Sequence, residues 1–243
     1  MLVITVDLDW APEIAITETL DALQSQGIVP TVFATHRSPC VEERMNDLEV
    51  GLHPFFHPES SHGKTIDEVV GTVLSIPHNI PAFRCHRFGS CNESKKALVA
   101  AGMKFSSNVC TDMDYVPPFR DRFGLKEIPI FLEDGGFLWN KHPLMVTSSL
   151  KTTLESPIPH VLLIHPMHFV INTPHFDYMV DIKKNLNRQE WKDLTKKKLE
   201  SFRWKGRGMR DYMLELFNIE QPFKTLLESL ATSSITSTTI AKS

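Results

Sequence analysis

The sequence has few of the features that mark secreted, membrane-spanning or disulfide-rich proteins. It contains only four cysteines, and no two of them are spaced as Cys-x-x-Cys, so we expect reduced thiols rather than a disulfide framework. No apolar run approaches the ~20 residues that a membrane span needs. The chain starts with Met1 and an apolar segment without a basic leader, which argues against a secretory signal. These absences predict a cytoplasmic protein.

An excess of one charge is also missing. The chain has 26 Lys and Arg against 29 Asp and Glu, which gives a net charge of −3. Such a balance offers no electrostatic reason to expect nucleic acid or an anionic membrane as a partner. It is ordinary for a soluble enzyme.

The length and composition fit one large α/β domain. The 243 residues are 42% hydrophobic and 23% charged, which is enough to bury a core. We expect a single domain over residues 1–231, in which residues 178–231 form a helical part of unknown role. Residues 232–243 are rich in Ser and Thr with little to bury, so we expect a disordered tail there.

Short apolar segments alternate with amphipathic stretches along the chain. This alternation predicts a mostly parallel sheet wrapped by helices. The expected strands are 2–7, 31–34, 48–52, 82–85, 104–106, 127–131 and 161–164. The expected helices are 14–26, 66–75 and 92–101, followed by a long loop at 112–126 and surface helices within 178–203.

Polar residues stand directly after several of these strands. In parallel α/β barrels the active site is built at the carboxyl ends of the strands, so these residues are expected to meet on one face. They are Asp7, Asp9, His53, His57, Arg84, His86, Ser106–Asn108 and His165.

The segment His53-Pro-Phe-Phe-His57 is the sharpest local signal for a metal. Residues four apart share one face of a helix, so both imidazoles could bind a single ion. The alternative is a pair of unrelated surface or capping histidines. The segment lacks the Glu of the zinc-protease helix His-Glu-x-x-His, so that mechanism is not indicated.

Asp7-Leu8-Asp9 supplies the carboxylates that such a site needs. If the strand continues to Trp10, side chains two apart point the same way and both carboxylates face the site. Asp9 can then bind the metal with the two histidines, while Asp7 stays free to accept a proton from bound water. The alternative is a solvated strand end or a helix cap.

Arg84 and His165 complete the candidate catalytic set. A guanidinium beside the free carboxylate would keep Asp7 ionised and oriented, although a surface ion pair is the commoner fate of an arginine. His165 ends a strongly apolar strand, where a lone histidine is more often a satisfied core residue. With the other residues present it is a candidate general acid.

At these residues the sequence resembles the polysaccharide deacetylases, the family with the NodB homology domain and a distorted (β/α)7-type barrel. Val6–Trp10 is similar to the first family motif, which implies that Asp7 is the base and Asp9 a metal ligand. His53 and His57 are similar to the His-x-x-x-His metal motif. The Asp-x-Asp form resembles an atypical intracellular branch, and the WbmS-like subgroup of surface-polysaccharide proteins is similar.

Two further motifs resemble the family as well. Phe83–His86 is similar to its arginine motif, which implies that Arg84 orients Asp7, but His86 and Arg87 stand where Pro and Tyr are usual. Leu163–Pro166 is similar to the last motif, which implies that His165 protonates the leaving amine. In the family an Asp tunes this acid, and its counterparts here are Asp112 or Asp114. Glu127–Ile130 with Asp134 also resembles a segment of the atypical branch.

The resemblance implies hydrolysis of a C–N amide bond, with deacetylation of an N-acetylated sugar or a surface-polysaccharide precursor as the expected reaction. Zn²⁺ is the default metal for two His and one Asp, although Fe, Co, Ni or Mn suit the same ligands. A hydrolase of a cyclic amide, imide or ureide is a competing hypothesis on the same fold. Two more competing hypotheses are a mononuclear iron oxygenase and a catalytically inactive carbohydrate-binding homologue.

Overall fold

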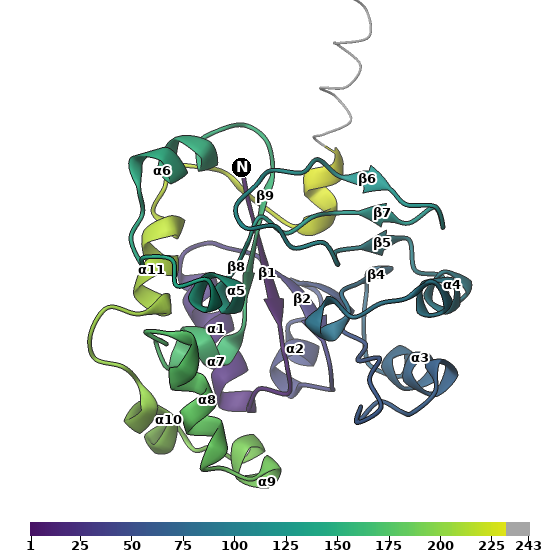
Figure 1. Cartoon of the computed structure of the whole chain (residues 1–243), viewed down its shortest axis with the longest axis horizontal. Coiled ribbons are helices and arrows are strands. Elements are labelled where there is room, and N and C mark those ends of the chain that lie inside the picture. Colours follow the sequence, from purple (N-terminus) through teal and green to yellow (C-terminus); the bar gives the residue numbers. More distant parts are fainter. Residues whose placement is uncertain (232–243) are drawn as a thin grey trace, which may run out of the picture.

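A computed structural model describes residues 1–231 of the chain, so the expected disorder of residues 232–243 lies outside the described part. The described residues form one curled sheet with helices around it (Figure 1). None of the helices in this part of the chain is long and apolar enough to cross a membrane. The four cysteines are free thiols.

The sheet is one continuous path of strands to which a tenth strand is added. The order along the path is β6-β7-β5-β4-β3-β2-β1-β9-β8, and β10 pairs with β1. All strand pairs are parallel except β6 with β7. The strands are β1 (Leu2–Asp7), β2 (Thr31–Ala34), β3 (Glu49–Leu52), β4 (Ala82–Phe83), β5 (Phe105–Ser106), β6 (Phe119–Arg120), β7 (Lys126–Glu127), β8 (Leu132–Glu133), β9 (His160–Ile164) and β10 (Phe223–Lys224).

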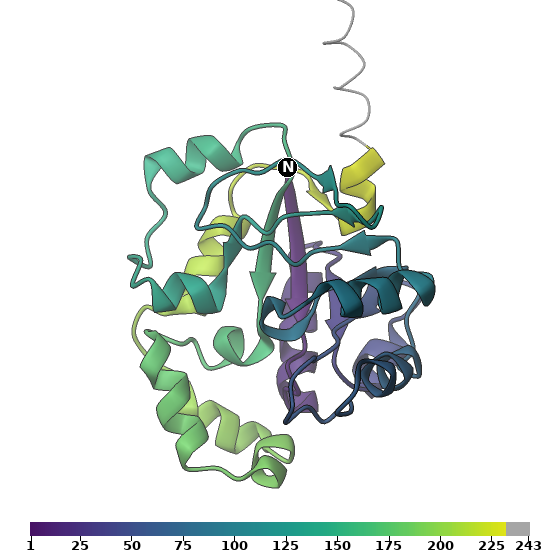
Figure 2. The same cartoon turned by 45° about the vertical axis from the view of Figure 1, so that its right-hand side comes forward.

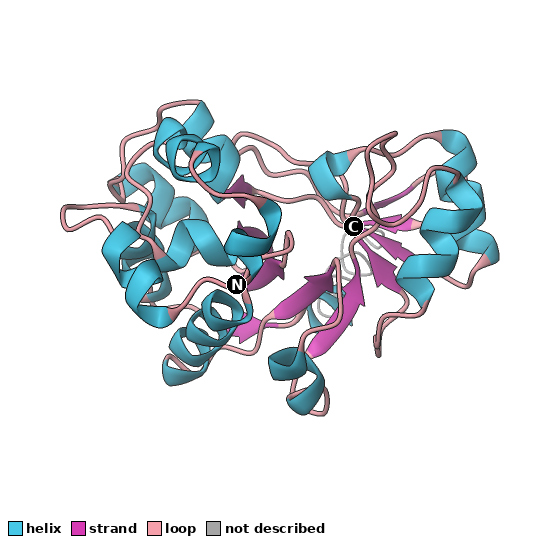
Figure 3. Ribbon diagram, turned by 90° about the horizontal axis from the view of Figure 1, so that it is seen from below, coloured by secondary structure: helices cyan, strands magenta, loops and turns pink. Residues whose placement is uncertain are grey.

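Helices cover the outside of this curved sheet (Figure 3). They are α1 (Glu13–Ser25), α2 (Pro39–Glu43), α3 (Ile66–Leu74), α4 (Asn92–Ala100), α5 (Asp134–Trp139), α6 (Ser148–Leu154), α7 (Pro166–Val170), α8 (Phe176–Lys184), α9 (Arg188–Lys192), α10 (Lys196–Phe202) and α11 (Met209–Phe217), with a 3-10 helix η1 (His86–Phe88). The predicted α/β class with a distorted barrel is confirmed.

Strand β1 is the centre of the fold. It pairs with β2, β9 and β10, and all six of its residues are buried. Leu2, Ile4 and Val6 pack into the larger apolar cluster, whereas Val3 packs into a second cluster that also contains Phe33 of β2. Successive side chains of β1 point to opposite faces of the sheet, and both faces are buried. This segment of the sequence is therefore continuously apolar.

The predicted strand 127–131 is wrong in its extent. Strand β7 covers only Lys126–Glu127, and the chain then passes across the sheet to pair with β9 through β8. Between these strands Ile130 forms an isolated bridge with Cys110. The apolar pattern therefore predicts correctly that the whole stretch is buried. It does not predict that the chain leaves β5 and pairs with β9 further on.

Helices α8, α9 and α10 form an arm beside the carboxyl ends of β1 and β9 (Figure 2). Their extent confirms the surface helices expected within residues 178–203. Asn187 caps α9 through its side chain, and Glu190 completes the capping box. Met179 of α8 and Leu199 of α10 are buried, which fixes the arm on the domain.

His160 gives the fold a pH dependence that does not involve the carboxyl ends of the strands. Its ring is fully buried between Tyr115 and Phe131, with centroid distances of 5.6 and 4.7 Å, and neither ring nitrogen has a side-chain hydrogen-bond partner. Burial, assisted by the N-terminal ammonium group, lowers its pKa to about 4. In the unfolded chain the pKa of this histidine is about 6.5.

We therefore predict that His160→Leu flattens the stability profile at mildly acidic pH. Because the folded pKa is lower than the unfolded one, this residue makes the free energy of unfolding fall as pH drops below about 6.5, by about 2 kcal/mol between pH 7 and pH 5. Urea denaturation of wild type and His160→Leu at both pH values measures the difference. An unchanged loss of stability in the variant would contradict the assignment.

Candidate active site

The polar residues expected to converge do meet at the carboxyl ends of the parallel strands. Asp7 ends β1, His53 follows β3, His86 follows β4 and His165 follows β9. All four line one pocket of about 730 Å³. The structure confirms the convergence predicted from strand ends for these four residues, whereas His57 does not line the pocket.

Asp7 and Arg84 form a buried ion pair at the floor of this pocket. Arg84 Nη1 donates to Asp7 Oδ1 at 2.8 Å and to Thr5 Oγ1 at 2.9 Å. The other guanidinium nitrogens donate to the carbonyl oxygen and Oγ of Ser107 at 3.0 and 2.8 Å. The guanidinium also lies 4.4 Å from the centre of the Phe33 ring. Arg84 is fully buried and Asp7 is 2% exposed, so each charge depends on the other.

Asp9 reaches the site by a route that the sequence does not reveal. The strand ends at Asp7, and the backbone of Asp9 and Trp10 is left-handed, with φ of 46° and 52°. The expectation that the strand continues to Trp10 is therefore wrong. A left-handed backbone costs a residue other than glycine about 1–3 kcal/mol and is found often at functional sites.

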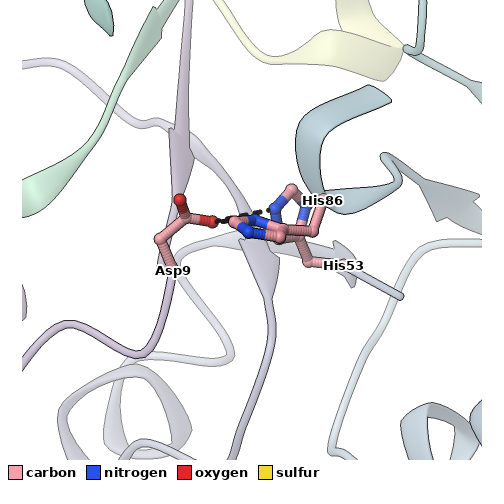
Figure 4. A group of neighbouring side chains, drawn as sticks. All are labelled: Asp9, His53 and His86. Carbon is pink, nitrogen blue, oxygen red and sulfur yellow. Dashed lines mark hydrogen bonds and ion pairs between the residues drawn. The ribbon is translucent and has the colours of Figure 1, made fainter. Parts of the chain in front are cut away.

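The turn points the Asp9 carboxylate toward the imidazoles of His53 and His86, both of which contact the same oxygen (Figure 4). Its Oδ1 lies 3.0 Å from His53 Nε2 and 2.8 Å from His86 Nδ1. Burial would raise the pKa of Asp9, but the surrounding histidines lower it well below its usual value. The Asp7 carboxylate is also close, with Oδ2 3.7 Å from His53 Nε2.

The residues Asp9, His53 and His86 fit a metal site. One ligand atom from each lies within 4.8 Å of the other two. Ligand atoms of a tetrahedral zinc ion with bonds near 2.1 Å are about 3.4 Å apart, so only small shifts separate this cluster from a coordination shell. Two imidazoles and one carboxylate leave positions for water and substrate, as a catalytic metal requires.

His57 stands apart from this cluster. Residues 53–56 form no helix, so the assumption that His53 and His57 share a helical face is wrong. The His57 side chain is exposed, and its ring stacks on Phe55 with centroids 5.3 Å apart. Its Nδ1 accepts a hydrogen bond from the backbone N–H of Glu59 at 3.2 Å. The structure brings His86 to the carboxylate in its place, and the metal content of a His57→Ala variant decides whether His57 also binds the ion.

His165 is held by a buried carboxylate. Asp134 is fully buried, and its Oδ1 lies 2.5 Å from His165 Nδ1, while its Oδ2 accepts from the backbone N–H of His165 at 2.7 Å. Burial opposes protonation of the imidazole, but Asp134 and Asp9 outweigh it and raise the pKa of His165 well above its usual value. His165 Nε2 lies 3.6 Å from Asp9 Oδ2, so it faces the metal cluster.

The Asp that contacts the candidate acid is therefore neither of the two suggested by motif position. Asp112 forms an ion pair with His142 at 2.7 Å, and Asp114 is exposed. Asp134 follows β8, which pairs with β9, so the neighbouring strand delivers it to His165. The sequence signal for it was the acidic pair Glu133-Asp134 after an apolar segment.

His86 was also missed as a member of the cluster with Asp9 and His53, although its place in the sequence carried the signal. It follows Arg84 by two residues, at the end of β4 and at the start of η1. Arg87 and Phe88 have left-handed backbones with φ of 56° and 55°, which turn the chain sharply after the histidine. The His86 ring packs edge-on against Phe55 and Trp10, with centroids 4.6 and 5.2 Å away.

The architecture and the site together define a class of protein. A curled parallel sheet that carries an Asp-x-Asp turn, clustered histidines and a buried arginine at its carboxyl ends has the fold of polysaccharide deacetylases. Two solved structures share it. WbmS of Bordetella bronchiseptica, assigned as a polysaccharide deacetylase involved in O-antigen biosynthesis, has a TM-score of 0.76 and 22% identity over 89% of both chains.

The second structure is a protein of Mycobacterium smegmatis that is assigned as a polysaccharide deacetylase. It has a TM-score of 0.50 and 14% identity, and the match covers 96% of this chain and 88% of the other. No curated protein gives a significant match. The sequence profile of the WbmS-like polysaccharide deacetylases matches residues 4–183. The chain belongs to this family.

We predict that Arg84→Met strongly destabilises the protein. The substitution leaves Asp7 buried without a counter-charge, which typically costs about 3–5 kcal/mol of folding free energy. Arg37→Ala, which breaks the exposed pair with Glu42, is the control and should change stability by less than about 1 kcal/mol. Urea unfolding at pH 7 measures both. Equal small effects would show that the Asp7–Arg84 pair is not a buried charge pair in solution.

Proposed function

We propose that the protein is a metal-dependent hydrolase that removes the acetyl group from an N-acetylated sugar, such as a surface-polysaccharide precursor. The observation that carries the proposal is the arrangement around one pocket: a buried Asp7–Arg84 pair, the cluster of Asp9, His53 and His86, and His165 held by Asp134. Membership of the WbmS-like polysaccharide deacetylases supports the reaction type. The assignment of WbmS to O-antigen biosynthesis supports the substrate class.

A divalent metal would be held by Asp9, His53 and His86. When bound, it would polarise the amide carbonyl and lower the pKa of its water towards ~7. Zn²⁺ is the default for these ligands, and Fe, Co, Ni or Mn suit them as well. A cytoplasmic location of the enzyme stays a prediction.

Asp7 is the proposed general base. Arg84 occupies its Oδ1, while Oδ2 faces His53, one of the metal ligands. The free oxygen is therefore on the side from which a water molecule at the metal would be activated. The two hydrogen bonds from Arg84 to Thr5 and Asp7 fix the carboxylate in this orientation and stabilise its negative charge.

His165 is the proposed general acid on the opposite side of Asp9. Asp134 holds Nδ1 and raises the pKa of the ring, so the imidazolium is available at neutral pH to give its Nε2 proton to the departing nitrogen. A backbone N–H after β4 would support the oxyanion. The amides of Cys85 and His86 already donate to Asn108 and Pro54 at 2.7 and 2.8 Å, which leaves the N–H of Arg87 as the candidate.

The proposed ligand set predicts that the metal requires His86 and not His57. After reconstitution with Zn²⁺, wild type should hold about one equivalent by mass spectrometry. Asp9→Ala, His53→Ala and His86→Ala should lose it, whereas His57→Ala should retain it because that side chain is exposed and outside the cluster. Loss of metal from His57→Ala with retention in His86→Ala would reverse the ligand choice. Absence of metal from every protein would contradict metal dependence.

The base assignment predicts a slow but metal-loaded Asp7→Asn variant. Removing a positioned base typically costs about 10²–10⁴-fold in rate, so acetate release from N-acetylated sugars should fall by this factor. Metal content should stay near one equivalent. An undiminished rate would exclude Asp7 as the base. If cyclic imides are hydrolysed by wild type while N-acetyl sugars are not, the function is that of a cyclic amide hydrolase on the same residues.

The role of Asp134 predicts a separation of kcat from KM. Asp134→Asn cannot stabilise a protonated His165 in the same orientation, so kcat should fall by about 10²-fold or more while KM changes little. Asp112→Asn is the matched control, because that carboxylate pairs with His142 and not with His165. Equal kinetic effects of the two substitutions would contradict the proposed role.

A further inference from the structure

Three basic side chains line the active-site pocket without an acidic partner. Arg87 lies in η1 after β4, Lys183 in the last turn of α8, and Arg188 at the start of α9. Within residues 1–231 none of the three forms an ion pair with a carboxylate. By contrast, Lys184 lies next to Lys183 on α8 but outside the pocket, and it pairs with Asp181 at 3.0 Å.

Lys183 is an exposed side chain that reaches over an aromatic ring of the neighbouring helix. Its Nζ lies 4.9 Å from the centre of the Trp191 ring. Desolvation lowers the pKa of Lys183, and the nearby Arg87 charge lowers it further, while Asp9 acts in the opposite direction. Lys183 is therefore within electrostatic range of both Arg87 and the metal cluster. Within the described residues neither cation forms an ion pair with a carboxylate, although Asp9 offsets part of their mutual repulsion, and an anion bound between them would lower the repulsion further.

The acidic residues of the pocket lie on other elements. Asp7 is paired with Arg84, and Asp9 contacts two imidazoles. Glu133 accepts from the backbone N–H of Gly136 at 3.0 Å, and Glu59 lies in the loop after β3. Asp7 and Asp9 thus place negative charge at the strand ends, whereas Lys183 of α8, Arg188 of α9 and Arg87 of η1 line the same pocket without forming an ion pair in the described part of the chain.

Aromatic rings on the same side provide surfaces for a sugar. Trp139 of α5 is 66% exposed although it lines the pocket, and it meets Phe176 of α8 edge-on with centroids 5.0 Å apart. Trp191 and Arg188 are three residues apart on α9 and therefore share a face. Rings of this kind offer a flat apolar face with adjacent polar groups, which suits a pyranose ring.

We propose that the pocket selects a sugar that carries a negative charge, a carboxylate or a phosphate, and that Arg87, Lys183 and Arg188 bind this group. The sugar class rests on the proposed function, whereas the preference for an anion is independent of it. In this arrangement the cluster of Asp9, His53 and His86 receives the acetamide group, and the three basic side chains receive the charged substituent. Neutral N-acetylated sugars should then be the poorer substrates.

The test uses sugars that contain no amide, so that nothing can be hydrolysed and a failure of the deacetylase assignment does not affect the result. Binding of glucose, glucuronate and glucose 6-phosphate to metal-loaded wild type is measured by isothermal titration calorimetry at low ionic strength. We expect at least one of the two anions to bind about tenfold or more tightly than glucose, and the preference to weaken at high salt. The tighter of the two identifies the group as carboxylate or phosphate.

The variants Lys183→Ala, Arg188→Ala and Arg87→Gly separate the three basic side chains from the metal as the source of this preference. Glycine is chosen at Arg87 because the backbone there is left-handed. Each variant should lose about tenfold in anion affinity, while Lys184→Ala should bind as wild type does. Circular dichroism checks that each variant is folded. Equal binding of all three sugars would overturn the proposal. An anion preference that survives in all three variants would also overturn it, because the metal alone would then bind the anion.

Discussion

The buried pair of Asp7 and Arg84 is the interaction on which the rest of the site depends. It joins the end of β1 to the end of β4, and the same guanidinium reaches Ser107 beyond β5. Three strand ends are therefore fixed to one another by hydrogen bonds from a single side chain that water does not reach. Such a pair contributes little net stability compared with apolar residues of the same volume, but it cannot be broken singly without a large cost. The proposed function explains its presence in the core, because Arg84 orients the Asp7 carboxylate beside the cluster of Asp9, His53 and His86.

Around this fixed point, short strained turns position the residues of the candidate metal site. Asp9 and Trp10 after β1, and Arg87 and Phe88 after η1 begins, both have consecutive left-handed residues. The first turn orients the carboxylate of Asp9. The second turn follows His86, whose imidazole contacts that carboxylate. Packing of Trp10 against the His86 ring couples the two turns. The strain is sustained because the strands on either side are buried and paired, which leaves the turns no relaxed alternative.

Much of the fold could be predicted from the sequence, because apolar segments alternating with amphipathic ones specify a parallel sheet wrapped by helices. Strands 2–7 and 31–34 were predicted with the bounds that the structure gives. The extent of β7 could not be predicted, because the pattern after Lys126 reports burial and not the neighbouring strand. The position of the site at the strand ends was also predicted. The polar residues that converge there as expected are Asp7, Asp9, His53, Arg84 and His165.

The errors in predicting the site residues arise from irregular turns and from contacts between residues that are distant in the sequence. His57 was paired with His53 on the assumption of a helix, but residues 53–56 take an irregular path. His86 contacts Asp9 across 77 positions, and Asp134 contacts His165 across 31. No local spacing encodes such pairs, whereas the order of strands in the sheet does.

The most direct test of this account is the coordination of the metal itself, measured by X-ray absorption on the Zn²⁺-loaded protein. The cluster of Asp9, His53 and His86 predicts two imidazole ligands in wild type and in His57→Ala, and no bound zinc in His86→Ala. One imidazole in His57→Ala with two in His86→Ala would contradict the ligand set, and with it the account of how the turns after β1 and β4 build the site.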